Sequence, residues 1–98
     1  MKKLLFTILI LFSFITNIFA EETIGYINGT EVNFRNKPSL NSKVISQLNR
    51  PEEIIILDIV VTSDIKYKYW YKIKTKENEI GYIYYLLVVT DPKLIGSD

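Results

Sequence analysis

The chain has 98 residues, of which 12 are basic and 11 acidic, and it contains no cysteine and no histidine. This length allows one small domain. The composition excludes disulfides and excludes metal sites built from thiolate or imidazole ligands. The nearly neutral charge argues against a nucleic-acid partner, because proteins that bind nucleic acid are usually strongly basic.

Residues 1–20 have the order of a secretory signal peptide. The basic start "MKK" is followed by the apolar run "LLFTILILFSFI" and by "TNIFA", which ends on the small residue Ala20. This order predicts export from the cytoplasm and cleavage after Ala20. The alternative is a retained membrane anchor, the one membrane contact that the sequence offers. Polar residues such as Thr16 and Asn17 disfavour it, because a spanning helix needs about 20 apolar residues.

Cleavage would leave 78 residues, with ten basic and 11 acidic side chains and a net charge of −1. We divide the chain into a signal peptide (1–20), a folded domain (21–90) and a flexible C-terminal tail (91–98). The tail is polar, and Pro92 disfavours a continuing central strand.

Short apolar runs alternate with turn-forming residues after the signal peptide, which is typical of a small all-β domain. In the segment 31–35, Val32 and Phe34 are expected to point inward. The run 52–61 is rich in β-branched residues on both faces and is therefore expected to cross the middle of the sheet. The expected strands are 23–27, 31–35, 43–48, 52–61, 64–76 and 79–89.

The segment "DIKYKYWYKIKTK" (64–76) holds the only tryptophan of the chain. Successive side chains of a strand leave by opposite faces, so Trp70 shares a face with the lysines while Ile73 faces the core. We therefore interpret Trp70 as partly exposed and available to a ligand. Two alternatives would bury it: a bulge that shifts the alternation, or a cover formed by the loop at 36–42.

A second aromatic group follows Gly81. A turn at 76–78 would bring Tyr82 and Tyr84 beside Trp70 on the outer face, with Ile83 pointing inward. For the loop "NFRNKPS", we favour a structural role, with Arg35 spanning backbone groups, over a role as a groove wall. The candidate ligand-binding residues are Trp70, Lys72, Tyr82, Tyr84 and Arg35.

Several pieces of the sequence, in this order, carry a resemblance to a known family. They are "VNFRNKPSLNSKVISQL", "EEIIIL", "WYKIK" and "IGYIYYLLV", and the match as a whole covers roughly residues 23–89. This stretch resembles the bacterial SH3 domain. The resemblance implies a small, five-stranded SH3-like barrel outside the cytoplasm, often attached to or serving enzymes of the cell wall, which binds rather than catalyses.

The chain departs from the family pattern at three positions. Pro51 and Tyr69 stand where the family usually has glycine, and Leu87 stands where it usually has tyrosine. In eukaryotic SH3 domains that tyrosine helps to line the peptide groove, so its replacement argues against recognition of proline-rich peptides.

Catalysis is poorly supported by the sequence. The commonest general base and the thiol nucleophile are missing. The acidic pairs Glu52/Glu53 and Glu77/Glu79 sit on opposite faces of a strand or beside a turn, where carboxylates are ordinarily solvated. We therefore expect no enzyme, no cofactor and no metal.

The function predicted is that of an exported, non-catalytic binding module of the cell envelope. Aromatic rings interleaved with lysines suit a polymer of sugars and carboxylates, so the first expected partner is peptidoglycan or its stem peptides. The alternative is docking on an envelope or secreted protein, because the same surface would suit an acidic protein partner.

The signal peptide makes the first testable prediction. Mass spectrometry of the protein from its native host should show Glu21 as the first residue. An intact Met1 in the membrane fraction would contradict cleavage.

Overall fold

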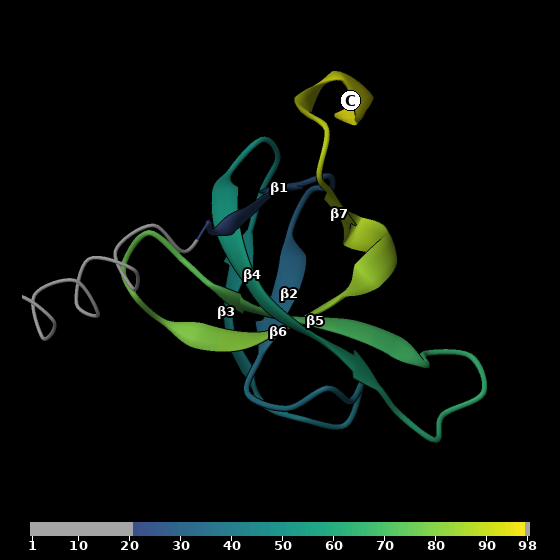
Figure 1. Cartoon of the computed structure of the whole chain (residues 1–98). Helices are drawn as coiled ribbons and strands as arrows, with labels where there is room; N and C mark the ends of the chain where they lie inside the picture. The colour runs from purple at the N-terminus through teal and green to yellow at the C-terminus, as the bar shows by residue number, and fades with distance from the viewer. Residues whose placement is uncertain (1–20, 98) are drawn as a thin grey trace, which may run out of the picture.

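The chain folds into one antiparallel β-sheet with two short 3₁₀ turns (Figure 1). The computed structural model describes residues 21–97. Within that part of the chain, no helix has the length and apolar character needed to cross a membrane. The elements are β1 (Thr23–Ile27), β2 (Val32–Arg35), β3 (Val44–Leu48), β4 (Glu53–Val61), β5 (Tyr69–Lys74), β6 (Ile80–Tyr84), η1 (Tyr85–Leu87), β7 (Val88–Val89) and η2 (Pro92–Leu94).

The strands hydrogen-bond in the order β3-β2-β6-β5-β4-β1-β7, so the sheet has seven strands with β3 and β7 at its edges. The predicted all-β class is confirmed, but the sheet is open rather than a closed five-stranded barrel. The difference lies partly in the segment 79–89, which the sequence predicts as one strand. The turn η1 divides it, and β7 then pairs with β1 through Tyr26↔Val89 and Ile27↔Val88.

The first four strands lie where the sequence predicts them, to within one residue at each end. The predicted strand 64–76 is shorter, because it begins only at Tyr69. Residues 62–68 instead form a loop, which we call the hairpin tip. The Asp64 carboxylate accepts hydrogen bonds from the backbone N–H groups of Lys66 and Tyr67, both at 2.9 Å, and this local pairing replaces a strand ladder.

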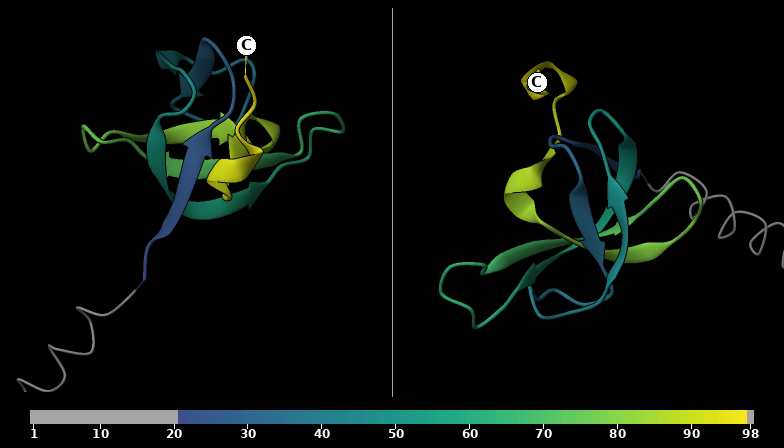
Figure 2. Two further views of the ribbon diagram at one scale, coloured as in Figure 1. Left: turned by 90° about the horizontal axis from the view of Figure 1, so that it is seen from above. Right: turned by 180° about the vertical axis from the view of Figure 1, so that it is seen from behind.

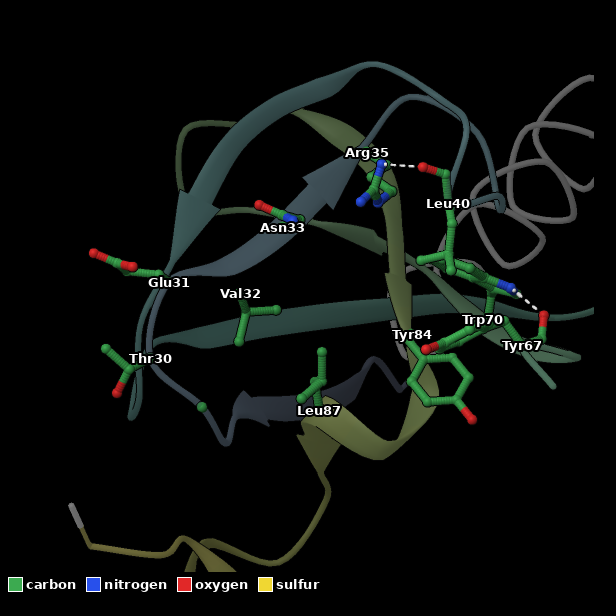
Figure 3. Close-up of a pocket in the computed structure, with 11 residues that line it drawn as sticks. Thr30, Glu31, Val32, Asn33, Arg35, Leu40, Tyr67, Trp70, Tyr84 and Leu87 are labelled. Carbon is green, nitrogen blue, oxygen red and sulfur yellow. Dashed lines mark hydrogen bonds between the residues drawn. The ribbon is translucent and has the colours of Figure 1, made fainter.

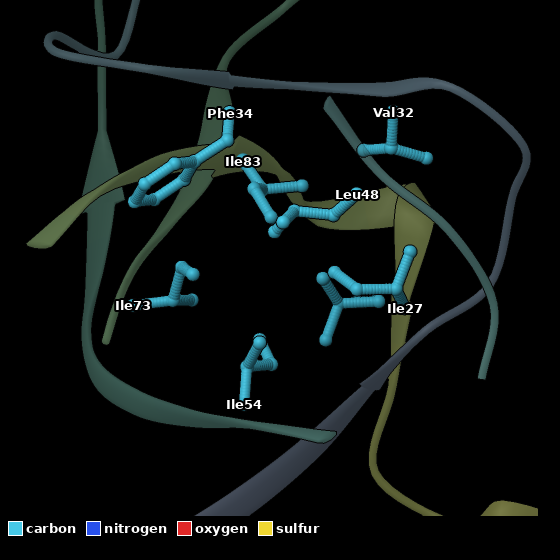
Figure 4. Close-up of a cluster of buried hydrophobic side chains, with 8 residues drawn as sticks. Ile27, Val32, Phe34, Leu48, Ile54, Ile73 and Ile83 are labelled. Atoms are coloured by element: carbon cyan, nitrogen blue, oxygen red, sulfur yellow. The ribbon is translucent and has the colours of Figure 1, made fainter. Parts of the chain in front are cut away.

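Alternating side chains of the strands build the hydrophobic core (Figure 4). Val32, Phe34, Ile73 and Ile83 all point inward, as predicted. Each fully buried side chain of this size stabilises the fold by roughly 1.5–3 kcal/mol. The core consists of Ile27, Val32, Phe34, Leu48, Ile54, Ile73, Ile83 and Val88.

Strand β4 lies between β5 and β1, as expected for a strand in the middle of the sheet. The second half of β4 is nevertheless exposed. A bulge interrupts its pairing with β5 between Ile56 and Asp58, and beyond it Ile59 and Val61 are 62% and 61% exposed. The reason is that the β4–β5 hairpin continues past the end of the core and projects from the body of the sheet (Figure 1).

The C-terminal residues fold back against Asn28, which directly follows β1. The Asp91 side chain caps η2 by accepting from the Lys93 N–H, and the Gly96 N–H donates to Asn28 Oδ1 at 2.8 Å. The predicted flexibility of this tail stays a prediction. The predicted signal peptide lies outside the described residues and also stays a prediction.

Gly81 marks the closest approach of β6 to β2 and gives a stability prediction. A Cβ atom at this position would lie 2.6 Å from the Arg35 carbonyl oxygen and 2.7 Å from the Phe34 ring. Because a backbone oxygen cannot easily move, we expect Gly81→Ala to lower the free energy of unfolding by about 1–3 kcal/mol.

Gly96→Ala is the matched control, because its added Cβ would meet no atom closer than 3.5 Å. Urea denaturation of this variant should give a value within about 0.5 kcal/mol of wild type. Equal stabilities for the two variants would contradict the close packing at Gly81.

Candidate functional site

Strands β5 and β6 carry four of the five predicted binding residues on their outer face, opposite the core. The register places Trp70 beside Tyr84 and Lys72 beside Tyr82. Strand β2 joins this face through its single pair with β6, Arg35↔Tyr82. The structure therefore places all five residues on one face of the sheet.

Trp70 lies on the predicted face, but the prediction that it is partly exposed is wrong. Its side chain is only 1% exposed, and it does not belong to the core cluster that contains Ile73. The indole Nε1 donates a hydrogen bond to the Tyr67 carbonyl oxygen at 2.8 Å, and the Tyr84 ring packs edge-on at 5.7 Å. Trp70 is thus the centre of a second, smaller packed cluster on the outer face.

Tyr84 joins this cluster to its neighbours through edge-to-face ring contacts, a favourable geometry for aromatic pairs. Its ring centroid lies 5.0 Å from that of Tyr67 and 5.3 Å from that of Tyr85. Tyr85 in turn lies 5.6 Å from Tyr69. The aromatic side chains therefore form a connected layer from the hairpin tip to η1.

The Tyr84 hydroxyl has a defined role within this layer. Burial raises the pKa of the Tyr84 phenol above its ordinary value, and the neighbouring Tyr85, Tyr67 and Asp64 raise it further. The hydroxyl donates to the Lys66 carbonyl oxygen at 3.3 Å.

Arg35 has the structural role that the sequence favours. Its Nη1 atom donates to the carbonyl oxygens of Leu40 and Ser42, both at 2.9 Å. These bonds hold the loop at 36–42 in place. The loop carries Leu40 toward the Trp70 cluster, which agrees with the alternative that this loop covers the tryptophan.

A groove opens where β2 and β6 diverge beyond their single pair, and we call it the aromatic groove (Figure 3). Its volume is about 280 Å³ and its lining is mainly apolar. Trp70, Tyr84 and Arg35 line it, whereas Lys72 and Tyr82 lie outside it on the same face. The lining consists of Gly29, Thr30, Glu31, Val32, Asn33, Arg35, Leu40, Tyr67, Trp70, Tyr84 and Leu87.

Eight of the eleven lining residues were not among the predicted binding residues, and three of these have large side chains: Tyr67, Leu40 and Leu87. Alternation assigned Tyr67 to the core face, but it lies in the hairpin tip rather than in a strand. Leu40 is the one large apolar residue of a polar loop, a signal that could have been read as a contact residue. Leu87 belongs to η1, and its direction could not be foreseen from an expected strand.

A comparison with protein families assigns the chain to a family. The family model described as "Bacterial SH3 domain" matches residues 30–88, which is more than half of the chain. The chain belongs to the bacterial SH3 domain family. No curated protein and no solved structure matches the chain significantly.

Bacterial SH3 domains are generally non-catalytic binding modules, often found outside the cytoplasm and associated with the cell wall. Glu31 is the one carboxylate in the lining of the aromatic groove. Residues 21–97 contain no group of three or more acidic side chains arranged to hold a metal ion.

The burial of Trp70 gives a prediction about stability. Trp70→Ala should remove the packed centre of the outer cluster and leave the Tyr67 carbonyl oxygen with the Thr62 hydroxyl as its remaining donor. Truncation of a buried tryptophan costs about 3–5 kcal/mol, so thermal melts should place this variant near Ile73→Ala in stability.

Tyr69→Ala on the same strand is the control, because the Tyr69 side chain is 42% exposed. Its loss should cost clearly less. A Trp70→Ala variant that melts like wild type would show that the indole is not packed as described.

Proposed function

We propose that this bacterial SH3 domain is an exported, non-catalytic binding module of the cell envelope that recognises peptidoglycan through its stem peptides. The observation that carries the proposal is the aromatic groove, a preformed, mainly apolar cleft with polar groups at its margins. Such clefts are the usual form of small-ligand and peptide sites.

The burial of Trp70 favours a peptide over a sugar ring as the group that enters the groove. A sugar would stack on an open aromatic face, but the indole is almost fully covered and Tyr84 packs against it edge-on. An extended peptide needs only apolar walls and hydrogen-bonding groups along its backbone. Leu40 and Leu87 supply the apolar walls, and the Asn33 side chain lies at the margin.

The charges around the groove suit a short peptide that carries both carboxylates and amines, as stem peptides do. Glu31 lies at one end of the groove and is held by a bond from its own N–H to Asn49 Oδ1 at 2.8 Å. Lys66 lies in the hairpin tip beside the other end. Charges of opposite sign at the two ends would orient a zwitterionic ligand.

A matched pair of leucine variants tests the proposal. Leu40 and Leu57 are almost equally exposed, at 45% and 44%, but only Leu40 lines the groove. Leu40→Ala should weaken sedimentation with purified sacculi by about tenfold, the usual effect of losing a contact residue worth somewhat over 1 kcal/mol. Leu57→Ala should bind as wild type does.

Competition identifies the part of the polymer that is bound. Soluble stem peptides should displace the wild-type protein from sacculi, while glycan strands freed of their peptides should not. Displacement by the glycan strands alone would overturn the peptide assignment. A wild-type protein that does not sediment with sacculi would overturn the proposal and leave an envelope protein as the partner.

A further inference from the structure

The hairpin tip presents a fully exposed isoleucine. Ile65 is 99% exposed, although it lies in the centre of an ordered loop. The loop is closed by a bond from the Thr62 N–H to the Lys68 carbonyl oxygen at 2.8 Å and by a bond from Thr62 Oγ1 to the Tyr67 carbonyl oxygen at 3.1 Å. The backbone of the tip is thus fixed in a form that directs Ile65 away from the protein.

The apolar surface continues behind the tip. Ile59 and Val61 of β4 are paired with Tyr71 and Tyr69 of β5, and three of these four side chains are more than 40% exposed. Tyr71 packs partly against the core and Tyr69 contacts Tyr85, whereas Ile59 and Val61 stay largely exposed within residues 21–97. The end of the hairpin therefore carries a band of aliphatic and tyrosine side chains below the exposed Ile65.

Lysines flank this apolar end. The Lys66 Nζ atom lies 5.5 Å from the Tyr67 ring centroid, and the Lys68 Nζ atom lies 5.6 Å from that of Tyr69. Neither lysine forms an ion pair within the described chain. Asp64 is the one acidic residue of the tip, and its carboxylate is already engaged with two backbone N–H groups.

The tip lies at the opposite end of the molecule from the N-terminal part of β1 and from the turn at 76–79 (Figure 2). That other end carries several carboxylates, among them Glu22, Glu77 and Glu79. The tip has two lysines and one aspartate, whereas the turn at 76–79 has two glutamates and one lysine, with Glu22 nearby in the N-terminal part. This polarity would orient the molecule at a negatively charged surface.

We propose that the β4–β5 hairpin tip binds the surface of an anionic lipid membrane, with Ile65 entering the headgroup region and Lys66 and Lys68 contacting lipid phosphates. Apolar side chains next to lysines bind the surfaces of anionic membranes. Tyrosine is enriched at the membrane–water interface. Because the loop is already ordered, little conformational entropy is lost on binding. This contact lies next to the aromatic groove, shares Lys66 with it, and adds a second attachment to the envelope.

A single fluorescent reporter at the tip tests the proposal. The chain has no cysteine, so Ser63→Cys in the full chain, collected after export from a bacterial host, gives one labelling site next to Ile65. A polarity-sensitive dye there should shift on titration with vesicles of equal parts phosphatidylglycerol and phosphatidylcholine. Vesicles of phosphatidylcholine alone should give little shift, and added salt should weaken the response.

Substitutions in the labelled protein separate the apolar and ionic contributions. Ile65→Ser should weaken the apparent vesicle affinity by about tenfold, and Lys66→Gln and Lys68→Gln by about fivefold each. Ile80→Ser is the matched control, because Ile80 is 53% exposed but lies beside the turn at 76–79. It should leave the affinity unchanged.

A second reporter position tests whether another part of the chain binds the vesicles. The dye placed through Glu77→Cys, at the opposite end, should stay silent. The proposal is overturned if the tip reporter does not respond to anionic vesicles, if the Glu77 reporter responds instead, or if Ile80→Ser weakens binding as much as Ile65→Ser does.

Discussion

The hydrogen bond from the Trp70 indole nitrogen to the Tyr67 carbonyl oxygen is the contact on which both functional surfaces depend. It joins the start of β5 to the hairpin tip, and the burial of the indole shields it from water. A bond in such a place is costly to break, because leaving a buried polar group without a partner destabilises the fold by about 1–3 kcal/mol. On one side of this bond Trp70 and Tyr67 line the aromatic groove, and on the other side the same backbone carries Ile65 outward.

Strand β5 thereby serves two clusters at once. Its inner face contributes Ile73 to the core, and its outer face contributes Trp70 to the aromatic layer. The chain has neither disulfides nor the histidine and cysteine ligands of common structural metal sites, so packing on both faces of the sheet carries its stability. Tyr84 ties the projecting hairpin to the aromatic layer through its contacts with Lys66 and Tyr67.

The sequence was sufficient to predict the all-β class, the first four strands and the inward direction of Val32, Phe34, Ile73 and Ile83, because these follow from alternation and turn chemistry. It also placed Trp70 on the correct face. It favoured exposure of Trp70 over the alternative of burial under the loop at 36–42, since an alternating pattern does not show how residues distant along the chain cover a side chain. The shortening of β5 came from hydrogen bonds of the Asp64 side chain, a local competitor of strand pairing that an alternating pattern conceals.

Hydrogen exchange of the Trp70 indole N–H tests the account most directly. The chain has one tryptophan, so its indole proton gives a single resonance in the NMR spectrum of the folded protein. If this proton is buried and bonded to the Tyr67 carbonyl oxygen, it should exchange many times more slowly than an indole in the unfolded chain. Exchange at the rate of a free, solvated indole would contradict the buried contact, and with it the shared support of the groove and the hairpin tip.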